Sequence, residues 1–191
     1  MFTKLAESIE FQSALRAEFQ EQKTQEDFEL AKYVSKQDSL LNFLIMESMR
    51  LTPAFCKFLS IMYQQHLLIE YAKGFSLPEC TSTAKNIGGY SIPPNTSVII
   101  DARRLNTDPI TWGPDGNTFR PERFADIPQS TCRYGFMRFG VGAASGKCLG
   151  KNVADIIFKL TSLAVLDRYL ITSIGKGTDE AVSSEVLFTP L

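Results

Sequence analysis

The sequence predicts a mainly helical fold of the α+β class, and three observations predict it. Apolar residues recur at helical spacing in three separated segments of the 191-residue chain. Between the second and third segments lies a stretch with strand and turn signals. A glycine-rich stretch with a single cysteine, FGVGAASGKCLGK, stands directly before the last and longest helical pattern. We therefore expect helices, a small β-hairpin and a cysteine-bearing loop within a single domain, residues 1–191.

The first quarter of the chain is helical in pattern. Residues 4–21 carry apolar side chains at loose helical spacing, and residues 22–37, which are charged and polar, predict a loop with a short helix. The next stretch, DSLLNFLIMESMRLTP, predicts a helix buried on nearly every side, because it is apolar almost all round. Asp38 or Ser39 can cap its start, and Pro53 ends it.

The rest of the chain alternates between irregular and regular segments. Residues 54–87 have apolar stretches without a clean period. The stretch GGYSIPPNTSVIID predicts a hairpin with strands near 89–92 and 96–101 and PPN as its turn. Residues 106–124 are dense in Pro, Gly, Asn and Asp, which predicts irregular chain with one or two short helical turns. Residues 149–170 predict a long amphipathic helix.

The composition excludes several classes of function. Hydrophobic residues make up 44% and charged residues 21%, as in an ordinary soluble globular protein. The net charge of −1 offers no basic surplus for nucleic acid. One histidine is too few for a typical zinc site and makes a Ser–His–Asp triad a poor hypothesis. No segment approaches the ~20 apolar residues of a membrane span, and the N-terminus has no secretory signal, so the sequence predicts no location for this chain.

The four cysteines could form two disulfides, but the chain is not small and has no secretory signal, so we favour free thiols in a reducing compartment. They are Cys56, Cys80, Cys132 and Cys148, and no two form a C-x-x-C pair. For the first three we expect the ordinary role of small buried apolar residues.

Cys148 is different because of its setting. It precedes a predicted helix start, where unpaired backbone N–H groups and the helix dipole favour an anion such as a thiolate. Nucleotide binding is disfavoured, since Val141 occupies the first glycine position of a phosphate-binding loop and Ser145 the last glycine of G-x-G-x-x-G. A cysteine nucleophile needs a base, and the only histidine, His66, lies in an unrelated segment. A cysteine that ligates the metal of a preformed cofactor needs no such base, so Cys148 could have this role. The alternative is that Cys148 is a buried structural cysteine at the N-terminus of the helix.

Glu47 and Arg50 stand three residues apart within the apolar helical segment, so they share one face of the helix. An unpaired charge there would cost several kcal/mol, so we expect the two to pair with each other and with a third group. Arg123, in FRPERF, is the candidate third partner. The alternative is a surface ion pair that contributes almost nothing to stability.

Taken in order, these motifs resemble the cytochromes P450. The chain has ESMR followed by LTP, then the hairpin, then FRPERF, then a glycine-rich loop that ends in Cys148-Leu149-Gly150. That loop is similar to the haem-thiolate signature F-x-x-G-x-R-x-C-x-G. The loop and KNVADIIFKL look most like filamentous-fungal biosynthetic members. The resemblance covers about residues 1–170 and only the C-terminal part of the family fold, so it implies a partial domain.

The resemblance implies a haem cofactor and a role for each motif. Cys148 would be the axial ligand to the haem iron, and Glu47, Arg50 and Arg123 would form a buried structural triad. The expected haem-contacting residues are Phe139, Gly140, Gly142, Lys147, Cys148 and Gly150. The implied activity is monooxygenation of a small organic molecule in secondary metabolism, with electrons from an NADPH-dependent reductase. A full-length relative would sit on the cytoplasmic side of the endoplasmic reticulum membrane, held by an N-terminal anchor.

The loop departs from the family signature in two ways. Nine positions lead from Phe139 to Cys148, two more than in the signature, and Gly146 stands where the arginine is expected. A haem propionate is then met by Lys147, by Arg133 or Arg138, or by no residue of this loop.

Other departures concern length. The stretch between Arg50 and the hairpin is longer than usual, which indicates an insertion in residues 54–87 or sequence that a correct transcript would lack. The family's oxygen-activating helix and the N-terminal anchor are expected before residue 4 and are absent from the sequence. We therefore expect little monooxygenase activity from the chain alone. The alternative function is that of an inactive remnant or an accessory protein that holds no haem.

Overall fold

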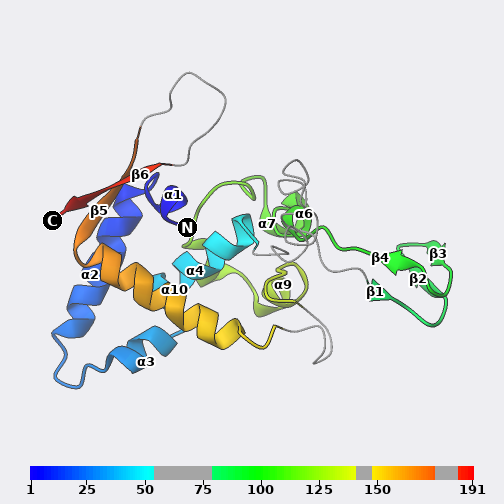
Figure 1. Cartoon of the computed structure of the whole chain (residues 1–191), viewed down its shortest axis with the longest axis horizontal. Helices are drawn as coiled ribbons and strands as arrows, with labels where there is room; N and C mark the ends of the chain where they lie inside the picture. The colour runs from blue at the N-terminus through cyan, green and yellow to red at the C-terminus, as the bar shows by residue number, and fades with distance from the viewer. Residues whose placement is uncertain (54–78, 141–147, 175–184) are drawn as a thin grey trace, which may run out of the picture. The chain divides into compact units, whose positions relative to one another are not determined.

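A computed structural model of the chain describes residues 1–53, 79–140, 148–174 and 185–191 (Figure 1). Most of the segment without a clean period lies outside the described residues, as do Cys56 and His66. The chain divides into two compact units. The first unit comprises residues 1–49, 118–128 and 148–191, and the second comprises 50–117 and 129–147. That the whole chain forms one partial domain stays a prediction.

The described elements are helices and three small antiparallel sheets, which confirms the mainly helical α+β class. The helices are α1 (Phe2–Leu5), α2 (Ile9–Lys23), α3 (Leu30–Ser35), α4 (Leu40–Leu51), α6 (Ala102–Leu105), α7 (Pro109–Trp112), α8 (Arg123–Asp126), α9 (Gln129–Tyr134) and α10 (Lys151–Leu166). The strands are β1 (Glu79–Cys80), β2 (Lys85–Ile87), β3 (Tyr90–Ile92), β4 (Ser97–Val98), β5 (Tyr169–Ser173) and β6 (Val186–Pro190). They pair as β1–β4, β2–β3 and β5–β6.

In the first unit, α10 packs against α3 and β5, and α2 also contacts β5 (Figure 1). The predicted helix over 4–21 is present as α1 and α2, whose apolar face buries Leu5, Phe11, Leu15 and Phe19. Each such side chain contributes about 1.5–3 kcal/mol when it leaves water. The packing of this face therefore holds α2 in place, since its own propensity could not.

A buried glutamine joins three elements of this unit. The Gln12 amide Nε2 donates to the Leu5 carbonyl at 2.9 Å and to the Ile171 carbonyl at 2.8 Å. Its Oε1 accepts from the Ile171 N–H at 3.0 Å. Gln12 is fully buried, so these bonds satisfy a polar group that would otherwise be costly to bury. The side chain from α2 thereby fixes α1 and β5 to one another.

Helix α4 begins where the sequence predicts. The Ser39 hydroxyl accepts from the Asn42 N–H at 3.2 Å, so Ser39 is the helix cap. The Glu18 carboxylate, from α2, accepts from the Leu40 N–H at 3.1 Å and from the Tyr33 hydroxyl at 2.6 Å. A carboxylate at a helix N-terminus is favourable because it meets the positive end of the helix dipole. Glu18 thus connects α2, α3 and α4.

The end of α10 is also held by side chains of α2. Arg16 donates from Nε to the Leu166 carbonyl at 2.8 Å and from Nη2 to the Tyr169 carbonyl at 3.2 Å. A cation at a helix C-terminus satisfies carbonyls that have no partner within the helix. The helix is shorter than predicted: the chain leaves it after Leu166 and continues as β5, so Leu170 belongs to a strand. The β5–β6 hairpin was not predicted.

In the second unit, the predicted hairpin has different partners. Gly88 and Gly89 have φ of 57° and 86° and form the tight turn between β2 and β3, with Ile87 paired to Tyr90. Two glycines at positive φ fit this turn without strain. The predicted pairing across PPN is wrong, because β4 pairs with β1 instead. Asn95 of that segment donates its N–H to the Thr81 carbonyl at 2.7 Å.

Two short helices follow: α7 lies in the region 106–124, where short helical turns were predicted, whereas α6 precedes that region and was not predicted. Asp101 accepts from the Arg104 N–H at 2.9 Å and caps α6, while Asp108 accepts from the Thr111 N–H at 3.2 Å and caps α7. Pro109 occupies the first turn of α7, where its missing N–H is not needed. Both starts therefore follow from local sequence.

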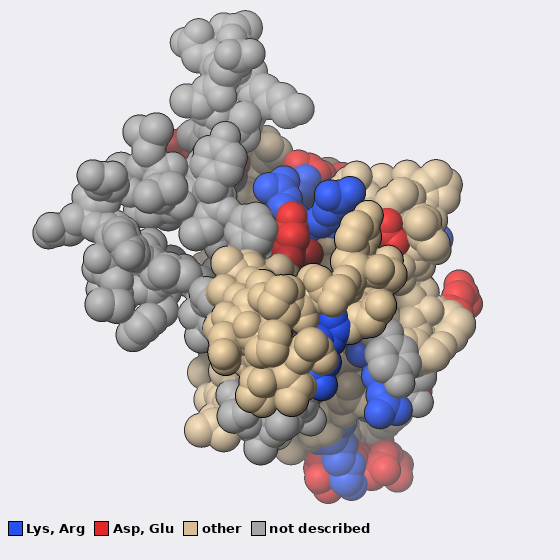
Figure 2. All heavy atoms as spheres, turned by 90° about the vertical axis from the view of Figure 1, so that its right-hand side faces the viewer, with Lys and Arg blue, Asp and Glu red and all other residues tan. Residues whose placement is uncertain are grey.

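Charged side chains of both signs are interspersed over the face shown in Figure 2, in keeping with the net charge of −1. Among the described residues, no helix has both the length and the hydrophobicity needed to cross a bilayer.

Candidate functional site

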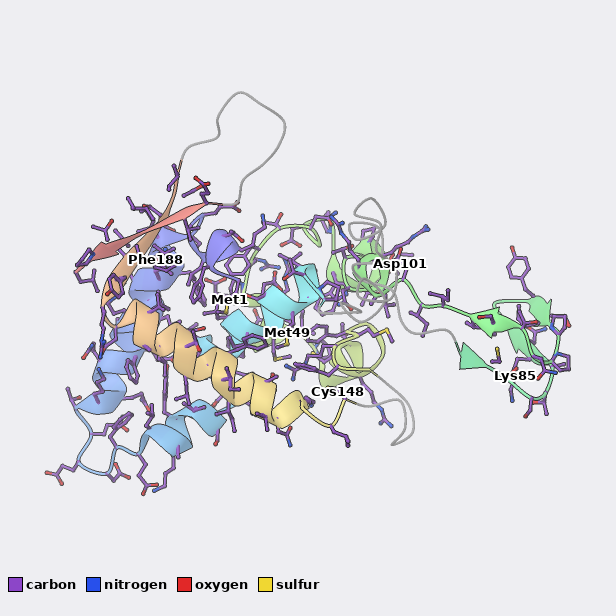
Figure 3. All side chains as sticks on the ribbon, in the orientation of Figure 1. Met1, Met49, Lys85, Asp101, Cys148 and Phe188 are labelled. Atoms are coloured by element: carbon purple, nitrogen blue, oxygen red, sulfur yellow. The ribbon has the colours of Figure 1, made fainter. Side chains whose placement is uncertain are left out.

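Cys148 lies just before α10, at the N-terminal end of that helix (Figure 3). Gly150 is the cap of the helix, and its carbonyl accepts from the Ala154 N–H at 2.9 Å. The Cys148 thiol is free and the residue is exposed. A Cβ added at Gly150 would lie 3.7 Å from Cys148 Sγ, in van der Waals contact. Glycine therefore leaves that side of the sulfur uncovered.

Helix α10 exposes apolar residues on one face and buries Lys159 and Ser162 together with Leu163 and Leu166 on another. Four positions on one face, together with the residue after Cys148, are exposed: Leu149 (99%), Val153 (61%), Ile156 (49%), Ile157 (54%) and Leu160 (40%). The opposite face is buried and includes Lys159, whose Nζ donates to the Val34 carbonyl at 2.8 Å. Exposed apolar surface of this extent marks a face that binds another molecule or segment. This face begins beside the Cys148 thiol.

The glycine-rich loop is described at its two ends. Phe139 and Gly140 both have positive φ, 55° and 79°, and the chain bends at Phe139. A non-glycine residue in the left-handed region is uncommon and often lies at a functional site. Gly142 and Lys147 lie outside the described residues. Of the other candidates for a propionate, Arg138 lies over the Phe136 ring, 5.5 Å from its centroid.

Glu47 and Arg123 form a buried ion pair in the first unit. Arg123 Nε lies 3.1 Å from Glu47 Oε1, and the side chains are 2% and 0% exposed. The same Glu47 oxygen accepts from the Arg120 N–H at 2.9 Å. Arg123 Nη2 also donates to the Thr118 carbonyl at 3.1 Å. The pair therefore holds residues 118–123 against α4.

Arg50 is fully buried and belongs to the second unit. Its Nη1 donates to the Asn106 carbonyl at 2.7 Å and to the Gly116 carbonyl at 2.5 Å. The guanidinium lies over the Trp112 ring, 4.8 Å from its centroid, in cation–π geometry. A planar cation with several donors is suited to hold two carbonyls at once. The role of Glu47, Arg50 and Arg123 as one structural triad stays a prediction.

The other described cysteines make poorer candidates for a metal ligand. Burial raises the pKa of the half-buried Cys132 thiol, and the nearby Arg138 opposes this shift only in part. A raised pKa disfavours the thiolate, which is the form that binds metals. Cys80 is exposed, so its predicted burial is wrong. It lies in a two-stranded sheet, which is too small to bury both of its faces.

The family profile described as Cytochrome P450 matches residues 68–190. Cytochrome P450 monooxygenase apdB of Emericella nidulans is 50% identical to this chain, in an alignment covering 94% of the chain and 36% of that protein. Cytochrome P450 monooxygenase opdB of Penicillium oxalicum is 46% identical, over 97% of the chain and 34% of its own length. The chain belongs to the cytochrome P450 family.

The fold agrees with this family. A solved zebra fish cytochrome P450, whose title mentions abiraterone, matches all of the chain and 43% of its own length, with a TM-score of 0.68 and 20% identity. The predicted partial cytochrome P450 fold is thereby confirmed. The chain spans about a third of the length of the curated P450 relatives it matches.

Membership in the P450 family implies a haem cofactor, and the described residues fit one. An iron already held in a macrocycle needs one protein ligand, and P450 enzymes use a cysteine thiolate. The free, exposed Cys148 thiol can supply it, and the exposed face of α10 beside it suits an apolar ring. Within the described ranges, no group of three or more His, Cys, Asp or Glu could hold a bare metal ion.

Two fully buried side-chain amides in the described part of this P450 chain are among the residues that sequence analysis missed. The Asn106 side chain pairs with both backbone groups of Met137, and Gln12 does the same with Ile171. Both are fully buried. The only sequence signal is an amide within an otherwise apolar or turn-rich stretch, which does not reveal the distant partner. Sequence periodicity could not have found them.

Proposed function

We propose that this chain provides the thiolate side of a haem-dependent monooxygenase, with Cys148 as the axial ligand to the iron. The observation that carries the proposal is the free, exposed Cys148 thiol at the start of α10, beside an exposed apolar helix face. Relatives at 50% and 46% identity are named as monooxygenases, which supports this activity. When bound, a thiolate-ligated haem supplies oxygen activation, because the ligand donates electron density to iron.

The residues of the chain perform three tasks in this proposal. Cys148 binds the metal, and the glycine at 150 leaves the sulfur open on one side. The apolar face of α10 excludes water from the ring. The Glu47–Arg123 pair and Arg50 keep the surrounding chain rigid, since each holds backbone groups in place. Phe139 and Gly140 turn the chain toward the loop, and Gly142 and Lys147 are expected to contact the cofactor.

The substrate and partners follow from the resemblance to filamentous-fungal biosynthetic members. We infer a small organic molecule of secondary metabolism as the substrate and an NADPH-dependent reductase as the electron donor. For a full-length relative, the same resemblance implies attachment to the cytoplasmic face of the endoplasmic reticulum through an N-terminal anchor, and no location is proposed for this chain.

Cysteine-to-serine variants test the iron ligand. The chain is expressed, reconstituted with hemin, reduced and exposed to carbon monoxide. Wild type should give the red-shifted band of thiolate ligation. Cys148→Ser should abolish this band, because serine is a poor ligand for the iron, while Cys132→Ser and Cys80→Ser should keep it. A Cys148→Ser protein that retains the band, or equal loss in all three variants, would refute the assignment.

A further inference from the structure

Lys159 is a buried cation that joins α10 to the end of α3. It is 3% exposed, and its Nζ donates to the Val34 carbonyl at 2.8 Å and to the Lys36 carbonyl at 3.4 Å. Val34 lies in the last turn of α3, and Lys36 is the residue that caps its C-terminus. The last carbonyls of a helix have no partner within it, and a cation also meets the negative end of the helix dipole. Lys159 therefore fastens α10 to the C-terminus of α3.

The buried residues of α10 lie in its C-terminal half. They are Lys159, Ser162, Leu163 and Leu166. Residues 151–158 form the first two turns of the helix, and all of them are described: six are exposed and two are half-buried. Lys159 is therefore the buried residue of α10 that lies closest to Cys148 along the chain. The part of the helix that bears the cysteine extends beyond this anchor.

The path from Lys159 to the sulfur is one continuous part of the chain. Residues 148–159 are all described, and they belong to the first unit together with α3. The Lys151 N–H, at the start of α10, donates to the Cys148 carbonyl at 3.4 Å, which ties the cysteine to the helix. The position of Cys148 relative to α3 therefore depends on how α10 is held.

The end of a helix that extends beyond its last buried anchor moves more than the anchor does. The eleven positions from Cys148 to Lys159 correspond to about 16 Å at the rise of an α-helix. Over that length, a tilt of about 2° displaces the cysteine by about 0.5 Å. A productive site requires its groups to be held within about 0.5 Å. A small loss of rigidity at Lys159 is therefore enough to misplace the sulfur.

We propose that Lys159 is a positioning residue for the cysteine ligand: by anchoring α10 to α3, it fixes where the Cys148 sulfur lies within the first unit. The inference rests on the proposed function, because it takes Cys148 as the ligand of the haem iron. It adds a residue outside both the glycine-rich loop and the Glu47–Arg123 pair. Lys159 acts through the helix and needs no contact with the cofactor.

The chemistry of the side chain predicts which replacements fail. Methionine at position 159 keeps an unbranched side chain of similar length but removes the charge and all the N–H donors. Arginine keeps a cation with several donors, although its planar head is larger than an ammonium group. We expect Lys159→Met to lose the anchor and Lys159→Arg to retain much of it.

Gln12→Leu is the matched control for a purely structural effect. Gln12 is also fully buried in the first unit, and its Nε2 also donates to two backbone carbonyls, those of Leu5 and Ile171. These bonds join α1 to β5, whereas the bonds of Lys159 join α10 to α3. The loss of Gln12 should therefore lower the stability of the unit and leave the placement of Cys148 unchanged.

The first measurement is the ligation of the iron. Each variant is reconstituted with hemin, reduced and exposed to carbon monoxide. Among haem-bound molecules, the fraction with the red-shifted thiolate band should fall several-fold in Lys159→Met, fall less in Lys159→Arg and stay unchanged in Gln12→Leu. Counting only haem-bound molecules separates a misplaced ligand from a loss of folded protein.

The second measurement uses the haem-free chain and pulsed electron paramagnetic resonance. One spin label is attached to Cys148, which is free and exposed, and the other to a cysteine introduced at the exposed Ala31 of α3, with the three other cysteines replaced by serine. The distribution of distances should broaden about twofold or more in Lys159→Met, because a segment with fewer buried contacts is locally less stable. It should broaden less in Lys159→Arg and stay unchanged in Gln12→Leu.

The outcomes separate this inference from the proposed function. If wild type shows no thiolate band, the proposed function fails, and the distance distribution alone decides whether Lys159 positions Cys148. If wild type shows the band and Lys159→Met keeps the same thiolate fraction, the positioning role is overturned while Cys148 remains the ligand.

Two other results would also overturn the positioning role. One is an equal loss of the band in Gln12→Leu, because the effect would then be one of general stability. The other is a loss of the band in Lys159→Met with an unchanged distance distribution, because the sulfur would then lie where it lies in wild type. If Lys159→Met does not fold, Lys159→Gln, which keeps a donor on a shorter side chain, is judged by the same two measurements.

Discussion

Replacing Arg123 by methionine is the most informative test of the buried ion pair. Met keeps an unbranched side chain of similar length but removes the charge that lies 3.1 Å from Glu47. At that separation, two unit charges attract by about 5 kcal/mol at an effective dielectric constant of about 20, and by about 1.3 kcal/mol in water. Because Glu47 is fully buried, its carboxylate cannot recover the loss by hydration.

The expected loss in the free energy of unfolding for Arg123→Met is about 3–5 kcal/mol, as for other buried pairs that lose one partner. Lys4→Met is a matched control, since Lys4 and Glu7 also lie 3.1 Å apart but are 40% and 57% exposed. It should cost under about 1 kcal/mol. Urea unfolding at a constant slope measures both values.

A double variant distinguishes the ion pair from side-chain packing. Glu47→Gln combined with Arg123→Met removes both charges, so it should cost less than the sum of the two single changes. The reasoning would be refuted if Arg123→Met cost no more than Lys4→Met. Strict additivity in the double variant would equally argue that the two charges do not interact.

Two further predictions concern packing and pH. Gly135→Ala should lower stability by about 1–3 kcal/mol, because its Cβ would overlap Thr111 Cγ2, and Thr111→Ser, which deletes that methyl, should recover part of the loss in thermal unfolding. Burial, and then the hydrogen bond to Glu18, raises the pKa of Tyr33 above its ordinary value of about 10. Stability from this group is therefore fully present below pH about 10 and falls above it, by up to about 1.4 kcal/mol per pH unit. Tyr33→Phe should flatten that decline while costing about 1.5–3 kcal/mol at neutral pH, and an unchanged profile above pH about 10 would contradict the assignment.

The sequence was sufficient where structure is set by neighbouring residues. Helix α4 could be predicted from its apolar run and from Ser39, which caps it as expected. The short helix that begins after Asp108 lies where short helical turns were predicted and has the same kind of local cap; the helix after Asp101 has such a cap too but was not predicted. In these cases the partners lie within one helical turn, so the pattern along the chain contains the information.

Features that depend on distant partners could not be predicted. Leu170 continues the helical spacing of α10, yet it pairs with Thr189 in the β5–β6 hairpin. The sequence predicted the hairpin turn at PPN, whereas the structure has it at Gly88 and Gly89. Both sites carry typical turn residues, and only the pairing of the strands distinguishes them. The apolar stripe on α10 indicates a helix face that packs against something apolar. The pattern does not reveal that most side chains of this stripe are exposed in this chain.

In the candidate site, too, features set by neighbouring residues could be predicted and features set by distant partners could not. The cysteine and the glycine before α10 could be recognised from a short motif, and so could Glu47 and Arg123 from theirs. The hydrogen bonds from Arg50 to Asn106 and from Asn106 to Met137 could not, because they join residues 56 and 31 positions apart and have no period along the chain.

The contact between Gln12 and Ile171 has a consequence for self-association. Ile171 is the central residue of the five-residue strand β5, and the Gln12 amide occupies both of its backbone hydrogen-bonding groups. A strand edge with open N–H and C=O groups is a template on which a second chain can add as a further strand. In this protein the middle of that edge is already taken by a side chain of the same molecule. The edge is therefore closed to the intermolecular pairing that begins β-aggregation.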